Sequence, residues 1–268
     1  MVDIDASETV NWDGGKGFKP IVLLGRFDGN GHVIRNLYIN RPGENYVGLF
    51  GRVYGEVKNV GLENVQVVGG EDVGGLVGLN YGTVSQSYST GSVVGSWYVG
   101  GLVGKNYYGT VTQSYSTGSV SGDDYVGGLV GYNSFSGTVE QSYSTGSVVG
   151  SDYVGGLVGN NGSTVKQSYS TGSVVGDDYV GGLVGRNYGT VRESYSTGSV
   201  AGDDDIGGLV GGNRHGTVTQ SYSTGSVLGT GNSSVGGLVG WNEDGTVTQS
   251  YSTGSVSGSS YVGGLVGK

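Results

Sequence analysis

The heptapeptide Ser-Tyr-Ser-Thr-Gly-Ser-Val occurs seven times in this chain of 268 residues, without a single change. A second phrase, Val/Ile-Gly-Gly-Leu-Val-Gly, occurs eight times and alternates with it. Successive heptapeptides are 26 to 29 residues apart. A fixed period of this length indicates a chain built from stacked, equivalent units. The heptapeptide tyrosines are Tyr88, Tyr115, Tyr143, Tyr169, Tyr195, Tyr222 and Tyr251.

The unit at residues 99–125 shows how each repeat is organised. Residues 99–104, 109–117 and 118–120 are short segments rich in Val, Tyr and Thr, separated by Gly and polar residues. Such segments are typical of strands, and no stretch has the 3.6-residue apolar period of a helix. The sequence therefore predicts an all-β parallel β-helix (β-solenoid) with three short strands in each coil of about 27 residues. The general bias of parallel crossovers favours a right-handed coil.

Other repeat folds fit this sequence less well. A β-propeller blade has four strands and needs about 40 residues or more, so the unit is too short. Collagen is excluded because the 60 Gly do not recur at every third position and there are only two Pro. The nine-residue period of calcium-binding β-rolls is absent from the sequence.

The repeat divides the chain into two parts. Residues 1–45 lack it and hold both prolines, so we expect them to form an N-terminal cap and an irregular first coil. Residues 46–268 are predicted to form one continuous domain of β-solenoid repeats. Because the sequence ends at Lys268, partway through a coil, we expect further repeats of the same parent chain beyond it. No leader follows Met1, so we expect any natural signal peptide to lie outside this sequence.

The charge balance restricts the partners. The chain has 13 Lys and Arg against 22 Asp and Glu, for a net charge of −9. Nucleic acid and anionic membrane surfaces are therefore not expected as partners. The sequence has no Cys, and no apolar run is long enough to insert into a membrane.

Two columns of amides are predicted if the units stack in register. Identical amides can then bond along the stack, as in cross-β ladders, or they can serve as turn residues that bond to the local backbone. The first column is Asn80, Asn106, Asn133, Asn161, Asn187, Asn213 and Asn242. The second is Gln86, Gln113, Gln141, Gln167, Glu193, Gln220 and Gln249.

The heptapeptide tyrosines form a third predicted column. Rings that face inward would fill the core, and each coil otherwise offers few large apolar side chains. Rings that face outward would form an aromatic strip able to contact sugar rings. Core filling favours the inward orientation. Parity does not decide the matter, because a bulge at the Gly-Gly pair or a corner at Gln would reverse it.

An acidic turn precedes the Gly-Gly phrase in several units. Stacking would bring these carboxylates into a column whose like charges repel, and a hard cation such as calcium would relieve the repulsion. Alternatively, the turn is simply solvated and keeps the rod soluble. Calcium is the one cofactor that the sequence suggests. Its candidate ligands are Asp123, Asp124, Asp152, Asp177, Asp178, Asp203 and Asp204.

Few residues in the sequence could form a catalytic site. The two histidines, His32 and His215, lie in different sequence contexts, and the serines are repeated rather than unique. A Ser-His-Asp triad is therefore not expected. Glycoside hydrolysis needs two carboxyls beside a sugar cleft, whereas the acids here are gathered mainly in one turn. We expect no enzymatic activity.

The repeated phrases resemble a known family. Gly-Gly-Leu-Val-Gly at 74–78, followed by Ser-Tyr-Ser-Thr-Gly at 87–91, resembles the GLUG-motif repeat of bacterial and archaeal cell-surface proteins. Residues 27–34 and 36–39 resemble the segment that often precedes such repeats. Together these likenesses cover almost the whole chain. The resemblance implies a secreted or surface-displayed β-helical stalk or adhesin segment, and it implies no catalytic residues.

The expected function is thus a non-catalytic, extracellular structural or adhesive segment of a surface protein, with surface glycans or other cell surfaces as partners. Ice binding is one alternative, because Thr-Val-Thr recurs at 110–112, 217–219 and 246–248. Charged residues at the equivalent positions of other units oppose a regular ice-binding face. A carbohydrate-binding or polysaccharide-processing β-helix is a further alternative.

Overall fold

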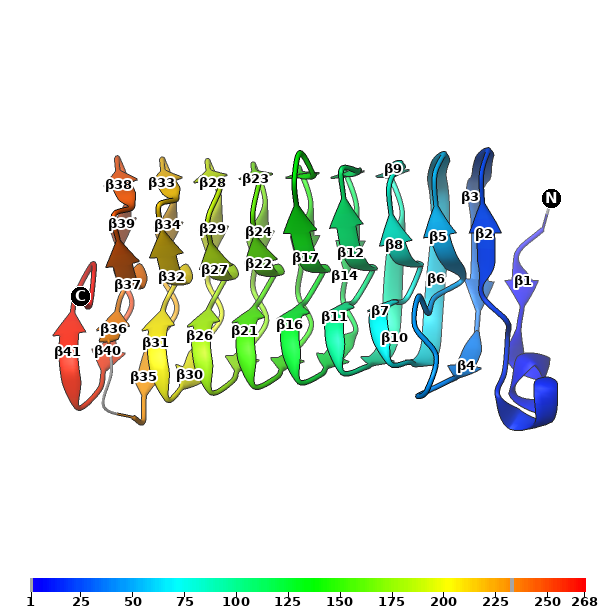
Figure 1. Ribbon diagram of the computed structural model, residues 1–268, viewed down its shortest axis with the longest axis horizontal. Helices are drawn as coiled ribbons and strands as arrows, with labels where there is room; N and C mark the ends of the chain where they lie inside the picture. Colours follow the sequence, from blue (N-terminus) through cyan, green and yellow to red (C-terminus); the bar gives the residue numbers. More distant parts are fainter. Residues whose placement is uncertain (1, 232–233) are drawn as a thin grey trace.

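The protein is a straight rod of stacked coils, with the two chain ends at opposite ends of the rod (Figure 1). The computed structural model describes residues 2–231 and 234–268. All pairings between named strands are parallel, and each coil pairs with the coil before it and the coil after it. The fold predicted from the repeat, an all-β solenoid, is confirmed.

One coil passes through three sheets. In the coil at 97–121, β11 (Trp97–Gly100) lies in sheet C and β12 (Val103–Tyr107) lies in sheet B. The chain then crosses sheet A as three very short strands, β13 (Thr110–Thr112), β14 (Tyr115–Ser116) and β15 (Ser119–Ser121). The segment at 99–104 is therefore divided between sheets C and B by a turn.

Sheets B and C lie side by side on the face of the rod that Figure 1 presents. Sheet B contains β2 (Ile21–Leu23), β5 (Phe50–Val53), β8 (Val77–Asn80), β12, β17 (Val130–Ser134), β22 (Val158–Asn161), β27 (Val184–Asn187), β32 (Val210–Arg214) and β37 (Val239–Glu243). Sheet C contains β7 (Glu71–Gly74), β11, β16 (Asp124–Gly127), β21 (Asp152–Gly155), β26 (Asp178–Gly181), β31 (Asp204–Gly207), β36 (Ser234–Gly236) and β41 (Ser260–Gly263).

Sheet A forms the rest of the wall and continues to the N-terminal end. Besides β13, β14 and β15, its strands are β1 (Ile4–Asp5), β3 (Arg26–Arg35), β4 (Tyr38–Asn40), β6 (Glu56–Val68), β9 (Thr83–Ser85), β10 (Tyr88–Val94), β18 (Thr138–Glu140), β19 (Tyr143–Ser144), β20 (Val148–Val149), β23 (Thr164–Lys166), β24 (Tyr169–Ser170), β25 (Val174–Val175), β28 (Thr190–Arg192), β29 (Tyr195–Ser196), β30 (Val200–Gly202), β33 (Thr217–Thr219), β34 (Tyr222–Ser223), β35 (Val227–Gly229), β38 (Thr246–Thr248), β39 (Tyr251–Ser252) and β40 (Val256–Ser257).

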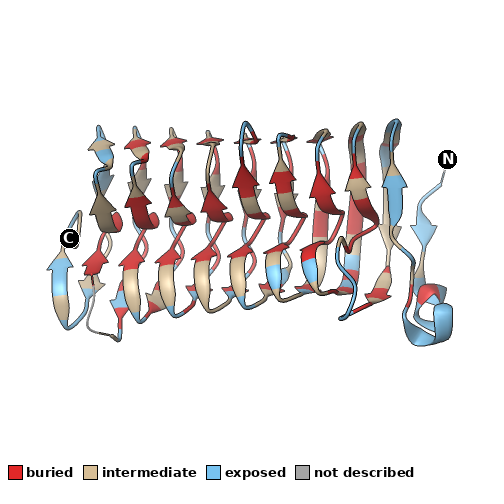
Figure 2. Ribbon diagram, in the orientation of Figure 1, coloured by how far each residue is buried: buried red, intermediate tan, exposed pale blue. Residues whose placement is uncertain are grey.

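The core is a set of aliphatic columns inside the rod. In one coil the buried side chains are Val99, Leu102, Val103, Val111 and Val120. The valines lie in register with their equivalents in the next coil, and Leu102 donates a backbone bond to its equivalent Leu129, so like side chains cover the apolar surface of each coil. Burial is continuous along the middle of the rod and decreases at both ends (Figure 2). Stacking supplies the core that a single coil lacks.

The last glycine of each Gly-Leu-Val-Gly phrase lets sheets B and C meet closely. A Cβ atom on Gly159 would lie 2.6 Å from the carbonyl oxygen of Gly131 and from the carbonyl carbon of Tyr125. Both neighbours are backbone atoms and cannot turn aside. Only glycine fits at this corner.

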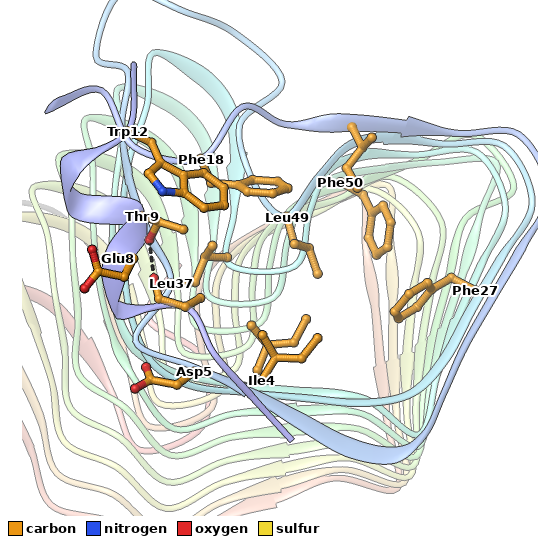
Figure 3. Close-up of a pocket in the computed structure, with 13 residues that line it drawn as sticks. Ile4, Asp5, Glu8, Thr9, Trp12, Phe18, Phe27, Leu37, Leu49 and Phe50 are labelled. Atoms are coloured by element: carbon orange, nitrogen blue, oxygen red, sulfur yellow. Dashed lines mark hydrogen bonds between the residues drawn. The ribbon is translucent and has the colours of Figure 1, made fainter. Parts of the chain in front are cut away.

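The N-terminal end is covered by a small cap. Strand β1 pairs with β3, and two short 3₁₀ helices follow it, η1 (Ser7–Asn11) and η2 (Asp13–Gly15). Sheet pairing passes without a break across the predicted boundary at 45/46, because β3 and β4 both pair with β6. The cap leaves an open apolar pocket of about 300 Å³ over the end of the core, lined by Trp12, Phe18, Phe27, Leu49 and Phe50 among others (Figure 3).

Candidate functional site

The Asn column is a buried, continuous hydrogen-bonded ladder. The Nδ2 of Asn106 donates to the Oδ1 of Asn133, and the Nδ2 of Asn133 donates to the Oδ1 of Asn161, both at 2.8 Å. Asn80, Asn161, Asn187 and Asn213 make the same bond to the next asparagine. The same amides also close the turn that follows, since the Nδ2 of Asn106 donates to the oxygen of Gly109 at 2.9 Å. Ladder and turn interactions therefore coexist.

The Gln column is not a ladder. Within the described residues its only side-chain bond from one member to the next joins the Nε2 of Gln167 to the Oε2 of Glu193, at 2.8 Å. Every member has a positive φ of about 50°. This position is a corner, and the prediction of a continuous glutamine ladder is wrong. These residues are turn residues, as the alternative interpretation of the sequence predicted.

The heptapeptide tyrosines face outward, and the inward orientation favoured by core filling is wrong. Tyr115 is half-buried, whereas its neighbours Ser114 and Ser116 are buried inside the rod. The reason is the left-handed conformation of Gln113, which adds one residue to the in–out alternation after Val111. Sequence parity alone could not reveal this reversal.

Small serines therefore occupy the interior positions that the tyrosines leave. The Oγ of Ser144 would lie 2.3 Å from a Cβ atom on Gly128, so the serine column packs directly on the Gly-Gly phrase. These hydroxyls are buried and have no hydrogen-bond partner: Ser116, Ser144, Ser170, Ser196, Ser223 and Ser252.

The outward tyrosines stack on one another along sheet A. Neighbouring ring centroids from Tyr88 to Tyr251 are 4.8 to 5.2 Å apart and their planes differ by 2° to 6°. Burial, together with a hydrogen bond from the Tyr88 hydroxyl to Glu63, raises the pKa of Tyr88 to about 12. Because each ring covers part of the next, this column offers few open ring faces for stacking a sugar.

Four predicted acids do line up. Asp124, Asp152, Asp178 and Asp204 are in register on neighbouring strands of sheet C and are half-buried. Burial, followed by the charges of Asp152 and Asp204, raises the pKa of Asp178 to about 6. Burial likewise raises the pKa of Asp124 and Asp152. The repulsion expected from stacking is therefore present.

The other predicted acids, Asp123, Asp177 and Asp203, are exposed at the adjoining turn. Among the residues that the structure describes, no group of three or more His, Asp or Glu side chains is arranged to hold a metal ion. Calcium at this column stays a prediction.

Sequence reasoning missed a second aromatic column. Tyr98, Tyr125, Tyr153 and Tyr179 lie in sheet C with a positive φ of 54° to 58° and stack at 4.7 to 5.3 Å. The left-handed backbone turns both this Tyr and the residue before it, Trp97 in the first unit and Asp in the other three, outward. Burial and the neighbouring rings raise the pKa of Tyr125 to about 12. The signal was available, because Tyr precedes Val-Gly-Gly in these four units.

Basic side chains rest on this second column. The register column Arg52, Leu79, Lys105, Tyr132, Asn160, Arg186 runs along the outer face of sheet B. The Nζ of Lys105 lies 4.5 Å from the ring centre of Tyr98, and the Cζ of Arg186 lies 4.9 Å from that of Tyr179. We call Arg52, Lys105, Tyr132 and Arg186, with the tyrosines of sheet C beside them, the cation–tyrosine strip.

An open aromatic cluster borders the strip on its other side. Tyr81, Tyr108 and Phe135 come from the turns between sheets B and A, and Tyr107 ends β12. The rings contact one another, and Lys105 reaches Tyr107 at 5.5 Å. The rings meet at varied angles, for example 85° between Tyr107 and Tyr108. Tyr108 and Phe135 stack on each other at 4.9 Å, but Phe135 is 56% exposed and Tyr108 is 53% exposed, so much of their surface remains open.

Both histidines pair with acids near opposite ends of the rod. The Nδ1 of His32 lies 3.4 Å from Asp3, and the Nδ1 of His215 lies 3.9 Å from Asp244. His32 belongs to the N-terminal strand β3, whereas His215 follows β32, so the structure does not bring them together.

Six segments match the family model described as "The GLUG motif", and together they make up more than half of the chain. They are residues 69–94, 95–121, 122–149, 150–175, 176–201 and 231–257. The chain belongs to the GLUG motif family. Each GLUG segment corresponds to one coil that passes through sheets C, B and A. Residues 202–230, between two of these matches, contribute β31 to β35 and follow the same course.

Two relatives match part of the chain at the sequence level. Halomucin of Haloquadratum walsbyi is 45% identical over 114 residues, which are 38% of this chain and 1% of halomucin. A "Putative Gly-rich membrane protein" of Evansella cellulosilytica is 41% identical over 93 residues, 31% of this chain and 10% of that protein. The chain thus matches only a small part of each relative.

A solved structure shares the fold. The crystal structure of a "putative immunoglobulin A1 protease" from Bacteroides ovatus aligns with a TM-score of 0.52 over 91% of this chain and 75% of that one. The identity is 20%, so the likeness concerns the fold alone. No helix among the described residues is long and apolar enough to cross a membrane.

Proposed function

We propose that this GLUG region is a non-catalytic, extracellular structural segment of a longer surface protein, where it acts as a stiff spacer whose outer faces make adhesive contacts. One observation carries the proposal: the coils from Asn80 to Asn242 repeat the same buried contacts in register, from the asparagine ladder to the valine columns. A stack in which each coil contacts only its neighbours forms an extended rod. Nine strands in sheet B correspond to about 40 Å of rod.

The relatives support a role within a larger protein. The matched segments occupy 1% of halomucin and 10% of the Evansella protein, so both relatives are much longer than the part that this chain matches. A rod of identical coils can vary in length simply by gaining or losing units, which suits a spacer.

The arrangement of reactive groups supports the non-catalytic part of the proposal. The two histidines lie near opposite ends of the rod, and the stacked acids meet one another rather than a nucleophile. An enzyme would need these groups gathered around one substrate. The fold that this chain shares with the Bacteroides ovatus protein carries no catalytic residues with it at 20% identity.

Single-molecule pulling through both chain ends tests the spacer. A stiff rod should resist force and then lose coils in discrete steps of about 27 residues, as expected of a chain whose coils are equivalent. Smooth extension at low force would contradict the proposal. Incubation with immunoglobulin A1 and with mixed peptides tests whether the segment is non-catalytic, because cleavage that depends on this chain would show that it is an enzyme.

Ice binding is the second candidate, favoured by one rank of threonines on sheet A. Thr83, Thr110, Thr138 and Thr164 pair in register, and the rank continues through Thr190, Thr217 and Thr246. The neighbouring rank is interrupted by an ion pair between Lys166 and Glu140, at 2.6 Å. Thermal hysteresis at micromolar protein would favour ice binding over the spacer. Ice crystals that grow with the same shape with and without the protein would exclude ice binding.

A further inference from the structure

The cations of the cation–tyrosine strip differ from most others in the chain. Arg26, Arg35, Arg41, Lys58, Lys166, Arg192 and Arg214 each lie within 4.0 Å of a carboxylate. Among the described residues, Arg52, Lys105 and Arg186 have no carboxylate that close and rest on tyrosine rings instead. Ring contacts position the three cations, and the buried carboxyl of Asp72 offsets part of the charge of Lys105 and Arg52.

The rings hold these cations in place. Arg52 lies 3.9 Å from the ring centre of Tyr46, and Arg186 contacts Tyr153, Tyr179 and Tyr188 at 4.7 to 5.4 Å. The Nε of Arg186 is buried without a hydrogen-bond partner. Because that atom is enclosed by protein, an incoming carboxylate would meet the terminal Nη atoms, of which Nη1 donates to the Tyr153 hydroxyl at 3.4 Å.

The three cations form a line along the rod. Arg52 and Lys105 are two rungs apart in the register of sheet B, and Lys105 and Arg186 are three rungs apart. With about 4.8 Å between rungs, the separations are about 10 Å and 14 Å. One pyranose residue of an extended chain is about as long as one rung, so regularly spaced sugar carboxylates can meet these cations.

We propose that the cation–tyrosine strip binds a linear acidic polysaccharide of the uronic acid type, with its chain parallel to the rod. Carboxylates meet Arg52, Lys105 and Arg186, while sugar rings lie against the exposed surface of Tyr108 and Phe135. This binding site is separate from the proposed spacer function, so the binding proposal can be disproved while the spacer function stands.

The acids of the protein decide on which side the glycan lies. Asp124, Asp152 and Asp178 stand on the far side of the second tyrosine column and repel an anionic chain. The glycan is thereby directed toward sheet B and the aromatic cluster. A nucleic acid is a weaker fit, because its dense phosphate charge opposes a protein with a net charge of −9.

Isothermal titration with oligogalacturonates tests the site directly. Chelator is present throughout to remove calcium bridges between sugar chains. The matched probe is the same oligomer with its carboxylates methyl-esterified, and single-stranded DNA is a third probe. We expect the acid form to bind at least tenfold more tightly than the ester, and binding of the acid form to weaken as salt is added.

Three variants locate the contact. K105Q and R186Q should each weaken binding of the acid form about tenfold, whereas F135A should weaken binding of both forms. K166Q removes the same charge from sheet A and should leave affinity unchanged. Circular dichroism and unfolding midpoints confirm that the variants fold.

The outcomes separate cleanly. Equal binding of the acid and the ester, or an equal loss in K166Q and K105Q, would overturn the proposal, as would no binding of the acid at millimolar concentration. Tighter binding of DNA than of the glycan would also overturn it in favour of a nucleic-acid surface. None of these results would bear on the stiffness measured by pulling.

Discussion

The Nδ2 of Asn133 donates a hydrogen bond to the Oδ1 of Asn161 at 2.8 Å, and both side chains are fully buried. The Nδ2 of Asn161 donates an equivalent bond to the Oδ1 of Asn187, again at 2.8 Å. One side chain therefore satisfies polar groups in the coils on either side. The rod is held together by such shared contacts as well as by its aliphatic columns.

Replacing Asn161 tests the ladder. Asn161→Ala would remove the bonds of this side chain to Asn133 and Asn187 and to the turn at Ser163, and should lower the free energy of unfolding by about 3 kcal/mol. The adjacent Asn160 is the matched control, because its Oδ1 has no partner in the structure. Asn160→Ala should change stability by less than about 1 kcal/mol. Urea titration compares them, and equal losses would count against the ladder.

Two serines separated by one residue should behave oppositely. The Oγ of Ser168 donates to the oxygen of Lys166 at 2.7 Å and accepts from the nitrogen of Ser142 at 3.2 Å. The Oγ of Ser170 is buried without a partner. Ser168→Ala should cost about 1 to 3 kcal/mol, and Ser170→Ala should be neutral or stabilising, because it removes an unpaired buried hydroxyl. A large loss in Ser170→Ala would show that its hydroxyl is bonded.

The corner between sheets B and C should tolerate only glycine. Gly159→Ala would press a methyl group against backbone atoms 2.6 Å away and should cost about 3 kcal/mol or more. Gly162→Ala is the control, because its nearest neighbour lies at 3.5 Å. Thermal melting compares the two. A stable Gly159→Ala protein would mean that the two sheets are farther apart than described.

The acid column should make stability depend on pH. The pKa of Asp178 is raised from 3.8 to about 6, so the folded state holds its proton more tightly than the unfolded chain does. Stability is then highest below about pH 4, falls as pH rises through 6, and levels off above that value. Asp178→Asn should raise the melting temperature at pH 7.5. It should also reduce the difference between the melting temperatures at pH 7.5 and pH 4.5.

Asp177→Asn is the control for this experiment, because Asp177 is exposed at the neighbouring turn. A pH profile that Asp178→Asn leaves unaltered would remove Asp178 as its source. The same samples test the predicted calcium column. A bound cation would raise the melting temperature of the original protein at pH 7.5, and a melting temperature that is indifferent to calcium and chelator would remove that prediction.

The sequence predicted the solenoid because period and strand composition agree in every unit. The position of Asn106 and its equivalents was also predictable, since an invariant amide two residues after Gly-Leu-Val-Gly must return at each rung. The direction of the heptapeptide tyrosines was not. It depends on the left-handed backbone at Gln113 and its equivalents, and residues other than glycine give no clear sign of that conformation.

The cation–tyrosine strip escaped sequence analysis for a different reason. Lys105, Tyr132 and Arg186 are unlike one another and occupy a position that varies between units, so no column of identical residues marks them. Only the register of sheet B brings them into line. Variable positions on a regular scaffold are where function can differ between GLUG proteins.

Distances between labelled coils test the central claim most directly. The chain has no natural cysteine, so spin labels can be placed at exposed serines, with Ser119→Cys paired in turn with Ser199→Cys, Ser226→Cys and Ser255→Cys. In-register stacking predicts that electron–electron distances rise by about 4.8 Å from each pair to the next. Distances that stay constant, vary irregularly or spread broadly would contradict the stacked rod.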